Sequence, residues 1–194
     1  MNKKIFKFFL VFFLTFQTES FATNPSDFVQ SAVNRASEIL KQNISKEEKM
    51  EKIELIAEEV VDIRGIAYYS LGSHRKTLST DKKKEYFKVF KKYFLKSFSS
   101  RLAQYSDPKI QVSSEKKLNE KYTIVSSILL ATEKTPQVKL DWRIVTKDIH
   151  KPLIIDVVIE GVSLARVQRE EFNSIIQNSN IDGLINNLNE FANK

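Results

Sequence analysis

The stretch EGVSLA, residues 160–165, holds the residue types of a nucleophilic serine site. Gly161, Ser163 and Ala165 form a loose version of the Gly-x-Ser-x-Gly motif, in which a strand-to-helix turn presents a catalytic serine. An apolar strand precedes the motif, and a helical pattern follows it. Two interpretations follow. The turn either presents a catalytic serine or closes the wall of a cavity.

A serine nucleophile needs a histidine as its base. In the α/β-hydrolase form of this motif the sheet is parallel and the histidine follows the serine, whereas His74 and His150, the only two histidines, both precede Ser163. A triad of another chain order exists on other folds, but two histidines allow few combinations. The more economical role for Ser163 is to cap a helix, with Gly161 allowing the chain to bend.

The remaining composition offers little other chemistry. The chain has no cysteine, which excludes disulfides, thiol nucleophiles and cysteine-ligated metals. Four glycines form no phosphate-binding loop, and two isolated histidines form no metal site. The sequence therefore predicts no catalytic residue, no metal and no cofactor.

Residues 1–22 resemble a cleavable secretory signal. Lys3, Lys4 and Lys7 precede a nearly unbroken apolar run at 8–16, and Ser20-Phe21-Ala22 offers small residues at the cleavage site. A membrane anchor needs about 20 apolar residues, and polar residues from Gln17 onward end this run early. We therefore expect a periplasmic protein that starts at Thr23 and forms one domain over 23–194.

The mature chain is basic, with a formal charge of +5 once the signal is removed. Lysines are concentrated in the segment 82–96. Such a run can bind nucleic acid, an acidic partner or anionic headgroups. A solvated helix face is the favoured interpretation, and no nucleic-acid binding is expected.

Periodicity divides the chain into a helical half, a sheet and a helical end. We expect helices at 24–43, 45–71, 79–105, 163–179 and 182–191, and strands at 109–114, 122–131, 138–146 and 153–160. Short connections favour an antiparallel meander. The predicted fold is α+β, with a four-stranded antiparallel sheet between N-terminal and C-terminal helices.

Alternation assigns faces to two of the strands. In the third strand, Leu140, Trp142 and Ile144 share one face. In the fourth strand, Leu153, Ile155, Val157 and Ile159 alternate against Asp156 and Glu160. The strand at 122–131 is apolar on both faces, so its inward parity stays open.

Several segments together resemble the MlaC family, also called the toluene-tolerance or Ttg2 auxiliary family. They are Leu71-Gly72, Tyr86-Phe87 with Phe90, Trp142-Arg143, DVVIEGVSLARVQREEF at 156–172 and IDGLINNL at 181–188. Where the family commonly has a glycine before the last helix, this chain has Asn180, which also tolerates a left-handed conformation.

This resemblance implies a function as well as a fold. It implies a monomeric NTF2-like cone whose apolar cavity holds the acyl chains of a diacyl phospholipid. The implied partners are an outer-membrane lipoprotein–porin complex and an inner-membrane ABC transporter with MCE domains. The protein would carry phospholipid between them and so maintain lipid asymmetry.

The candidate lipid-binding residues are the large apolar side chains expected on the walls of that cavity. They are Leu71, Phe87, Phe90, Phe94, Leu140, Trp142, Ile144, Ile155, Val157, Ile159, Val162, Leu164 and Val167. An aspartate at position 155 is expected to expel the lipid. The alternatives are an enzyme on the same fold, with Asp156 or Glu160 deep in the cavity, and a cavity-free interaction module.

Overall fold

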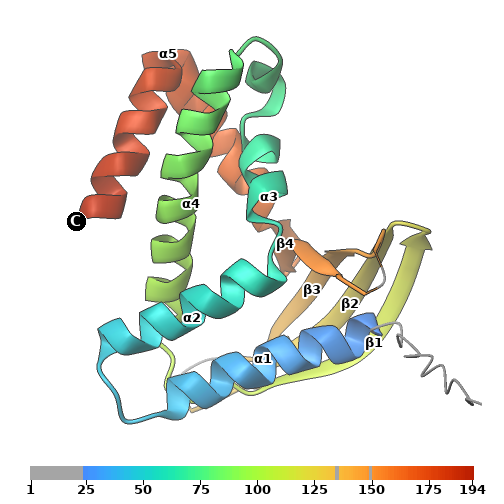
Figure 1. Cartoon of the computed structure of the whole chain (residues 1–194). Helices are drawn as coiled ribbons and strands as arrows, with labels where there is room; N and C mark the ends of the chain where they lie inside the picture. Colours follow the sequence, from blue (N-terminus) through green and yellow to red (C-terminus); the bar gives the residue numbers. More distant parts are fainter. Residues whose placement is uncertain (1–23, 134–135, 149) are drawn as a thin grey trace, which may run out of the picture.

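A layer of helices stands beside an antiparallel sheet, and one further helix crosses the face of that sheet (Figure 1). The computed structural model describes residues 24–133, 136–148 and 150–194. The expected signal at 1–22 lies outside these residues. The helices are α1 (Pro25–Lys41), α2 (Lys46–Val60), α3 (Ile63–Ser70), the 3-10 turn η1 (Gly72–Lys76), α4 (Thr80–Leu102) and α5 (Leu164–Asn193). The strands are β1 (Ile110–Asn119), β2 (Tyr122–Leu129), β3 (Val138–Val145), β4 (Leu153–Ile159) and β5 (Val162–Ser163).

Side-chain caps start the first, second and fourth helices where the sequence predicts them. Asn24 Oδ1 accepts a hydrogen bond from the backbone N–H of Ser26, at 2.8 Å. In the capping box, Glu48 N–H donates to Ser45 Oγ, and Ser45 N–H donates to the Glu48 carboxylate. Ser79 Oγ accepts from the backbone N–H of Lys82. Each cap satisfies a backbone donor that has no partner within its helix.

The expected helix over 45–71 is broken in two at Val61 and Asp62. Val61 forms an isolated parallel bridge with Ile154 of β4, and Asp62 N–H donates to the Ile154 carbonyl at 2.9 Å. The Asp62 carboxylate then caps α3 by accepting from the backbone N–H of Gly65. The break therefore attaches the helical layer to the edge of β4.

The sheet has five strands in chain order, all antiparallel, and the expectation of four was one strand short. The extra strand, β5, is only two residues long and pairs with the end of β4. β1 also continues to Asn119, through the segment expected to be a turn, because Asn119 pairs with Tyr122 around a two-residue turn.

A tight hairpin joins β4 to β5. Ile159 pairs with Val162, and the two residues between them, Glu160 and Gly161, have φ values of 48° and 82°. Two consecutive positive φ values are typical of a type I′ turn, whose twist matches that of the flanking strands. The glycine of the serine motif is thus a hairpin residue.

The two helices expected at 163–179 and 182–191 are the two halves of α5, which bends at Asn180. Asn180 has φ 56° and ψ −174°. Its φ is positive as expected. A positive φ together with an extended ψ, however, is a backbone conformation that almost only glycine adopts. The Asn180 Oδ1 atom accepts from the backbone N–H groups of Asp182 and Gly183, so it caps the second half of the helix.

Replacing Asn180 by glycine should stabilise the fold. Relief of roughly 1–3 kcal/mol of backbone strain outweighs the few tenths lost when glycine replaces an asparagine cap. We expect the free energy of unfolding, measured by urea titration, to rise by about 1 kcal/mol. Asn180→Ala keeps the strain and loses the cap, so it should lower the same quantity by about 1 kcal/mol. A glycine variant less stable than the parent would show that the backbone here is not strained.

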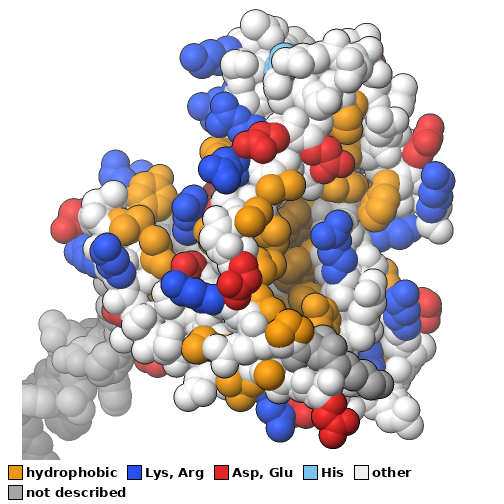
Figure 2. Space-filling view, turned by 180° about the vertical axis from the view of Figure 1, so that it is seen from behind, with side chains coloured by type: hydrophobic (Ala, Val, Ile, Leu, Met, Phe, Trp, Pro, Cys, Tyr) orange, Lys and Arg blue, Asp and Glu red, His pale blue; other side chains and the backbone are white. Residues whose placement is uncertain are grey.

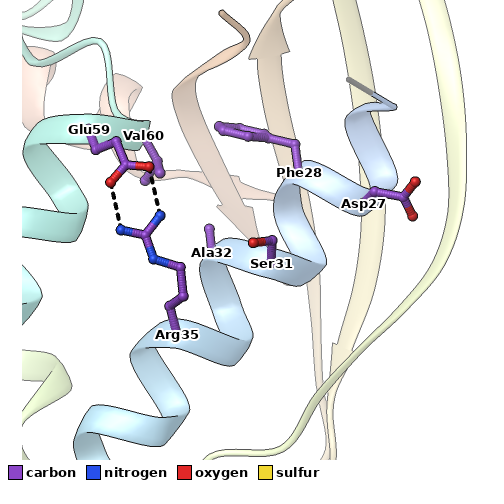
Figure 3. Close-up of a pocket in the computed structure, with 7 residues that line it drawn as sticks. All are labelled: Asp27, Phe28, Ser31, Ala32, Arg35, Glu59 and Val60. Carbon is purple, nitrogen blue, oxygen red and sulfur yellow. Dashed lines mark hydrogen bonds and ion pairs between the residues drawn. The ribbon is translucent and has the colours of Figure 1, made fainter. Parts of the chain in front are cut away.

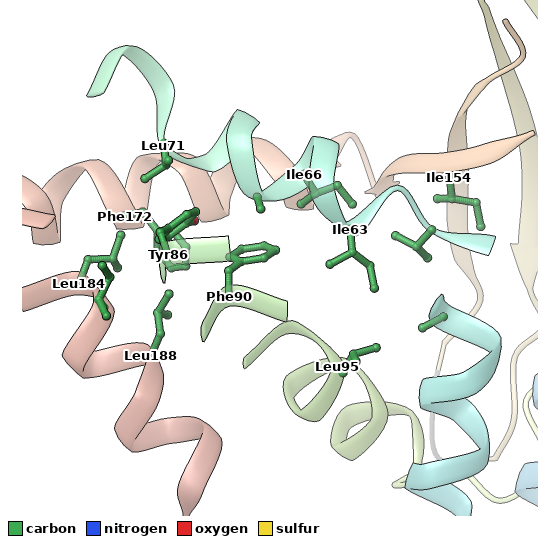
Figure 4. Packing of buried hydrophobic residues seen from close by; sticks show 14 of the residues in the cluster. Ile63, Ile66, Leu71, Tyr86, Phe90, Leu95, Ile154, Phe172, Leu184 and Leu188 are labelled. Carbon is green, nitrogen blue, oxygen red and sulfur yellow. The ribbon is translucent and has the colours of Figure 1, made fainter. Parts of the chain in front are cut away.

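Two hydrophobic clusters hold the domain together. The larger one joins α2, α3, α4 and α5, with Tyr86, Phe90, Phe172 and Leu184 among its most buried members (Figure 4). Ile154 of β4 belongs to it as well. In the smaller one, α1 packs on the sheet through Val29 and Val33, against Val125 and Ile144. α1 therefore covers only part of the sheet.

Candidate functional site

The strand register defines the face of the sheet that turns toward the helices. Leu140 pairs with Ile159, and Trp142 pairs with Val157. On β2 the buried positions opposite them are Ser127 and Val125, which settles the parity that the sequence left open. These side chains form the inner face of the sheet.

A β-bulge interrupts the expected alternation on β4. Arg143 pairs with Asp156 and Ile144 pairs with Ile154, so Ile155 is an extra residue that the register skips. The expected regular alternation is wrong for Leu153, which pairs with Val145 on the outer face, and Ile154 lies opposite Ile144 on the inner face. That Ile155 lines the cavity stays a prediction. Ile155 itself is half-buried.

A hydrogen bond fixes the ring of Trp142 on the inner face. Its Nε1–H donates to Ser127 Oγ at 2.8 Å, and Ser127 is fully buried on the neighbouring strand. The bond satisfies the polar edge of the indole and leaves its apolar face for packing. Trp142 contacts both hydrophobic clusters, so it lies where the α1 side of the sheet meets the helical layer.

Three of the predicted lining residues lie in solid core. Phe90 is 0% exposed, with the rings of Tyr86, Phe94 and Phe172 about it at centroid distances of 5.7, 6.0 and 6.1 Å. Leu71 is 1% exposed in the same cluster. Ile144 is also fully buried, under α1. In this structure these three side chains support the wall and face no open space.

Other predicted residues on α4 are only half-buried. Phe94 stacks on Phe98 with centroids 5.8 Å apart, and both rings pack against the larger cluster without being enclosed by it. Phe87 lies toward α3, where the Arg64 guanidinium sits 4.7 Å from its ring centroid. Phe98, which was not among the candidates, therefore belongs to the candidate site more clearly than Phe87.

Three apolar residues near the start of α5 are exposed. Val162, Leu164 and Val167 retain 48%, 45% and 44% of their accessible surface. Figure 2 shows apolar side chains gathered around a hollow near the middle of one face of the molecule. A contiguous apolar surface that stays exposed, in contrast to single scattered apolar residues, is typical of a binding site.

The serine of the motif is structural. Ser163 Oγ accepts from the backbone N–H of Arg166 at 3.1 Å, as an N-cap does, and donates to the Asp156 carboxylate at 2.6 Å. Asp156 is 6% exposed and also accepts from the Ala165 N–H and from Arg143. This network ties the outer face of β4 to the start of α5.

The histidines lie elsewhere. His74 Nε2 shares a hydrogen bond with Asn173 Oδ1 at 2.9 Å. His150 precedes the first residue of β4, whereas Ser163 pairs with Val158 near the last residue of that strand. Within residues 24–133, 136–148 and 150–194, no group of three or more histidine, aspartate or glutamate side chains is placed to hold a metal.

Removing the Ser163 hydroxyl should weaken the fold without touching the apolar hollow. Ser163→Ala loses the cap and leaves the buried Asp156 carboxylate short of a donor, so we expect a loss of about 1–2 kcal/mol in the free energy of unfolding. Ser163→Thr keeps the hydroxyl and serves as the control in urea unfolding. A hydrolytic activity that disappears in Ser163→Ala while stability is unchanged would contradict the structural role.

Two pockets open on the surface of the described chain. One, of about 280 Å³, lies between α1 and α2 and is lined by Phe28, Ala32 and Val60 with an ion pair at its edge (Figure 3). Arg35 donates to both oxygens of the Glu59 carboxylate, at 2.7 and 2.6 Å, and this hydrogen bonding lowers the pKa of Glu59. The pair fastens α1 to α2. The other pocket, of about 360 Å³, is lined by Tyr68, Arg75, Lys76 and Lys83.

These features define a class of protein. It is an α+β domain that combines an antiparallel sheet with a helical layer and carries an apolar hollow on one face, and its Gly-x-Ser-like motif serves as a helix cap. None of the described helices is both long and apolar enough to cross a bilayer.

The chain belongs to the MlaC family, because the family model described as "MlaC protein" matches residues 30–190. A curated relative from Haemophilus influenzae, the intermembrane phospholipid transport system binding protein MlaC, is 26% identical over 196 aligned residues, which cover 97% of this chain and 91% of the relative. The resemblance drawn from the sequence is thus confirmed.

A solved structure supports the fold. The phospholipid-binding protein from Ralstonia solanacearum, in complex with a phospholipid, superimposes with a TM-score of 0.74 at 15% identity. The match covers 88% of this chain and 97% of that one. The α+β architecture expected from the sequence is confirmed, with the strand count corrected to five.

Proposed function

We propose that this chain is a periplasmic phospholipid carrier. It holds the acyl chains of one diacyl phospholipid between the inner face of the sheet and α4, with the headgroup in water. It passes the lipid between an outer-membrane lipoprotein–porin complex and an inner-membrane ABC transporter. It performs no catalysis and needs no cofactor.

The observation that carries the proposal is the set of half-buried apolar side chains on the two sides of the domain. Trp142 and Val157 come from the sheet, and Phe94 and Phe98 come from α4. Val162, Leu164 and Val167 would form the rim. The names of the H. influenzae relative and of the R. solanacearum protein, each of which refers to phospholipid, support the same ligand.

The physical need for a carrier is large. Two acyl chains of common length contain roughly 30 methylene groups, and each costs about 0.8 kcal/mol when exposed to water. Their transfer into water would cost on the order of 20 kcal/mol. A phospholipid therefore does not diffuse freely across an aqueous compartment, and an apolar enclosure replaces the bilayer interior.

The proposal includes an opening of the domain as lipid enters. The two surface pockets, of about 280 and 360 Å³, lie at the small end of the range for drug-sized ligands, and neither would hold two acyl chains. We expect the Phe94–Phe98 side of α4 to move away from the sheet as lipid enters. Apolar side chains that are half-buried without lipid then become fully buried by it.

Mass spectrometry of an organic extract tests the proposal. The mature protein, purified from the periplasm of a bacterial host without detergent, should yield about one diacyl phospholipid per chain. The intact protein mass should correspond to a chain that starts at Thr23. A protein that extracts without lipid, even after incubation with liposomes, would contradict the carrier function and favour a cavity-free interaction module.

Two other outcomes would contradict other parts of the proposal. Recovery of hydrolysed lipid from those liposomes would favour the enzyme. A membrane-bound product that retains residues 1–22 would contradict the periplasmic localisation.

A further inference from the structure

The second surface pocket is formed where three short stretches of chain meet. Tyr68 comes from α3, Arg75 and Lys76 come from η1, and Lys83 comes from the first turn of α4. The pocket is about 360 Å³ and open to solvent. Three of its four lining side chains are cationic, so the fold has placed three positive charges in one concavity.

These charges have no acidic partner in the described part of the chain. Three other lysines of the same run do form ion pairs: Lys82 pairs with Glu85 and Asp182, Lys84 pairs with Asp81, and Lys91 pairs with Glu58. Arg75, Lys76 and Lys83 take part in none of the ion pairs that the described residues form. Their mutual repulsion is uncompensated, and an anionic ligand would relieve it.

Aromatic rings lie beside the cations. The ring of Tyr68 packs against Phe87 at a centroid distance of 6.5 Å, and the Arg64 guanidinium lies over the Phe87 ring, 4.7 Å from its centroid. Tyr68 is half-buried, with an apolar ring and a polar hydroxyl. Tyrosine next to lysine and arginine is typical of surfaces that lie at the headgroup level of a membrane.

We propose that Arg64, Tyr68, Arg75, Lys76 and Lys83 form a docking surface for the phosphate headgroups of an anionic bilayer. Arg75 and Lys76 of η1 and Lys83 of α4 stand around an open pocket, so they suit several headgroups side by side. A site for one soluble phosphate would instead converge its donors in an enclosed space. None of these five residues is among those proposed to hold the acyl chains, and the surface serves to hold the carrier at a membrane while cargo moves. It therefore goes beyond the proposed cargo function.

Vesicle sedimentation tests the docking surface. The mature protein is mixed with vesicles of phosphatidylcholine alone, or of equal parts phosphatidylglycerol and phosphatidylcholine, at roughly 0.05 M and 0.5 M sodium chloride. We expect it to pellet with the anionic vesicles at low salt only. The variant Arg75→Gln/Lys76→Gln/Lys83→Gln should bind them about 100-fold more weakly, because each basic side chain at the surface contributes about a factor of five.

A matched variant separates the pocket from net charge. Lys46→Gln/Lys116→Gln/Lys121→Gln removes the same charge from exposed positions elsewhere and should bind within about threefold of the parent. Both variants should keep the parent's melting temperature and its extracted lipid. Equal loss of vesicle binding in the two variants, or a parent that does not prefer anionic vesicles, would overturn the proposal.

Two further measurements identify the ligand of the pocket. Inorganic phosphate that displaces the protein from vesicles more than sodium chloride of equal ionic strength would assign the pocket to a soluble phosphate and overturn the membrane role. Loss of cargo lipid in the pocket variant would assign these residues to the cargo site. Retained cargo with lost vesicle binding supports the docking surface, and this result is independent of whether the carrier function holds.

Discussion

A Val157→Asp protein should fold and be recovered without phospholipid. Val157 pairs with Trp142 on the inner face of the sheet, and it is half-buried against the larger cluster. A carboxylate at this position would either remain charged beside the acyl chains or be neutralised, at a cost of several kcal/mol against binding. Each 1.4 kcal/mol lowers affinity tenfold, so the affinity for phospholipid should fall by at least about a hundredfold, and the variant should extract with much less lipid than the parent.

The control is an aspartate on the opposite face of the same sheet. Ile128 is half-buried on β2 and pairs with Lys139, which would stabilise the new carboxylate. Ile128→Asp should therefore keep its lipid. Circular dichroism and melting curves establish that both variants are folded. A folded Val157→Asp protein with a full complement of lipid would remove this face of the sheet from the cargo site.

Truncating Phe90 should give the largest loss of stability. Its ring is fully buried among Tyr86, Phe94 and Phe172, so Phe90→Ala removes a large apolar group and leaves a cavity. Such substitutions cost about 3–5 kcal/mol. For a domain of this size we expect the melting temperature to fall by roughly 10 °C.

Phe98→Ala is the matched variant on the same helix. Phe98 is only half-buried and stacks on Phe94, so its truncation should cost less than half as much stability. If Phe98 contacts the acyl chains, however, its loss should reduce lipid retention in proportion to the area removed. Equal destabilisation by the two variants would contradict the distinction between the core and the lining of α4.

The sequence predicts the local features that depend on neighbouring residues. The helix starts at Ser45 and Ser79, the cap at Ser163 and the bend at Asn180 all appear where expected. Each of these signals is encoded within a few residues, by a side chain that satisfies its own backbone. The same is true of the alternation on β3, which the structure reproduces from Leu140 to Ile144.

Features that depend on pairing between distant segments are not predicted. The bulge at Ile155 arises from the register with β3, and nothing in LIIDVVI distinguishes a regular strand from a bulged one. The break at Val61 is similar, because it follows from a bridge to Ile154 that lies more than 90 residues away.

The sequence predicts which apolar side chains turn inward, but it does not predict which of them are buried in the core and which face open space. An apolar stripe on a helix shows which face turns inward, and it does not show whether that face meets another side chain or an open space. Phe90 and Phe94 are four residues apart on α4, yet the first is enclosed and the second is partly open. Arg75, Lys76 and Lys83 also read as ordinary surface until η1 and α4 bring them together.

Trp142 gives the protein an optical reporter of its own occupancy. It is the only tryptophan in the chain, and its indole N–H is fixed to Ser127 while its ring lies on the face proposed to meet the acyl chains. Indole emission shifts with the polarity around the ring, so loading and release of lipid should change the fluorescence of the unmodified protein. Stopped-flow mixing with vesicles could then time each transfer step without a dye, a label or an engineered cysteine.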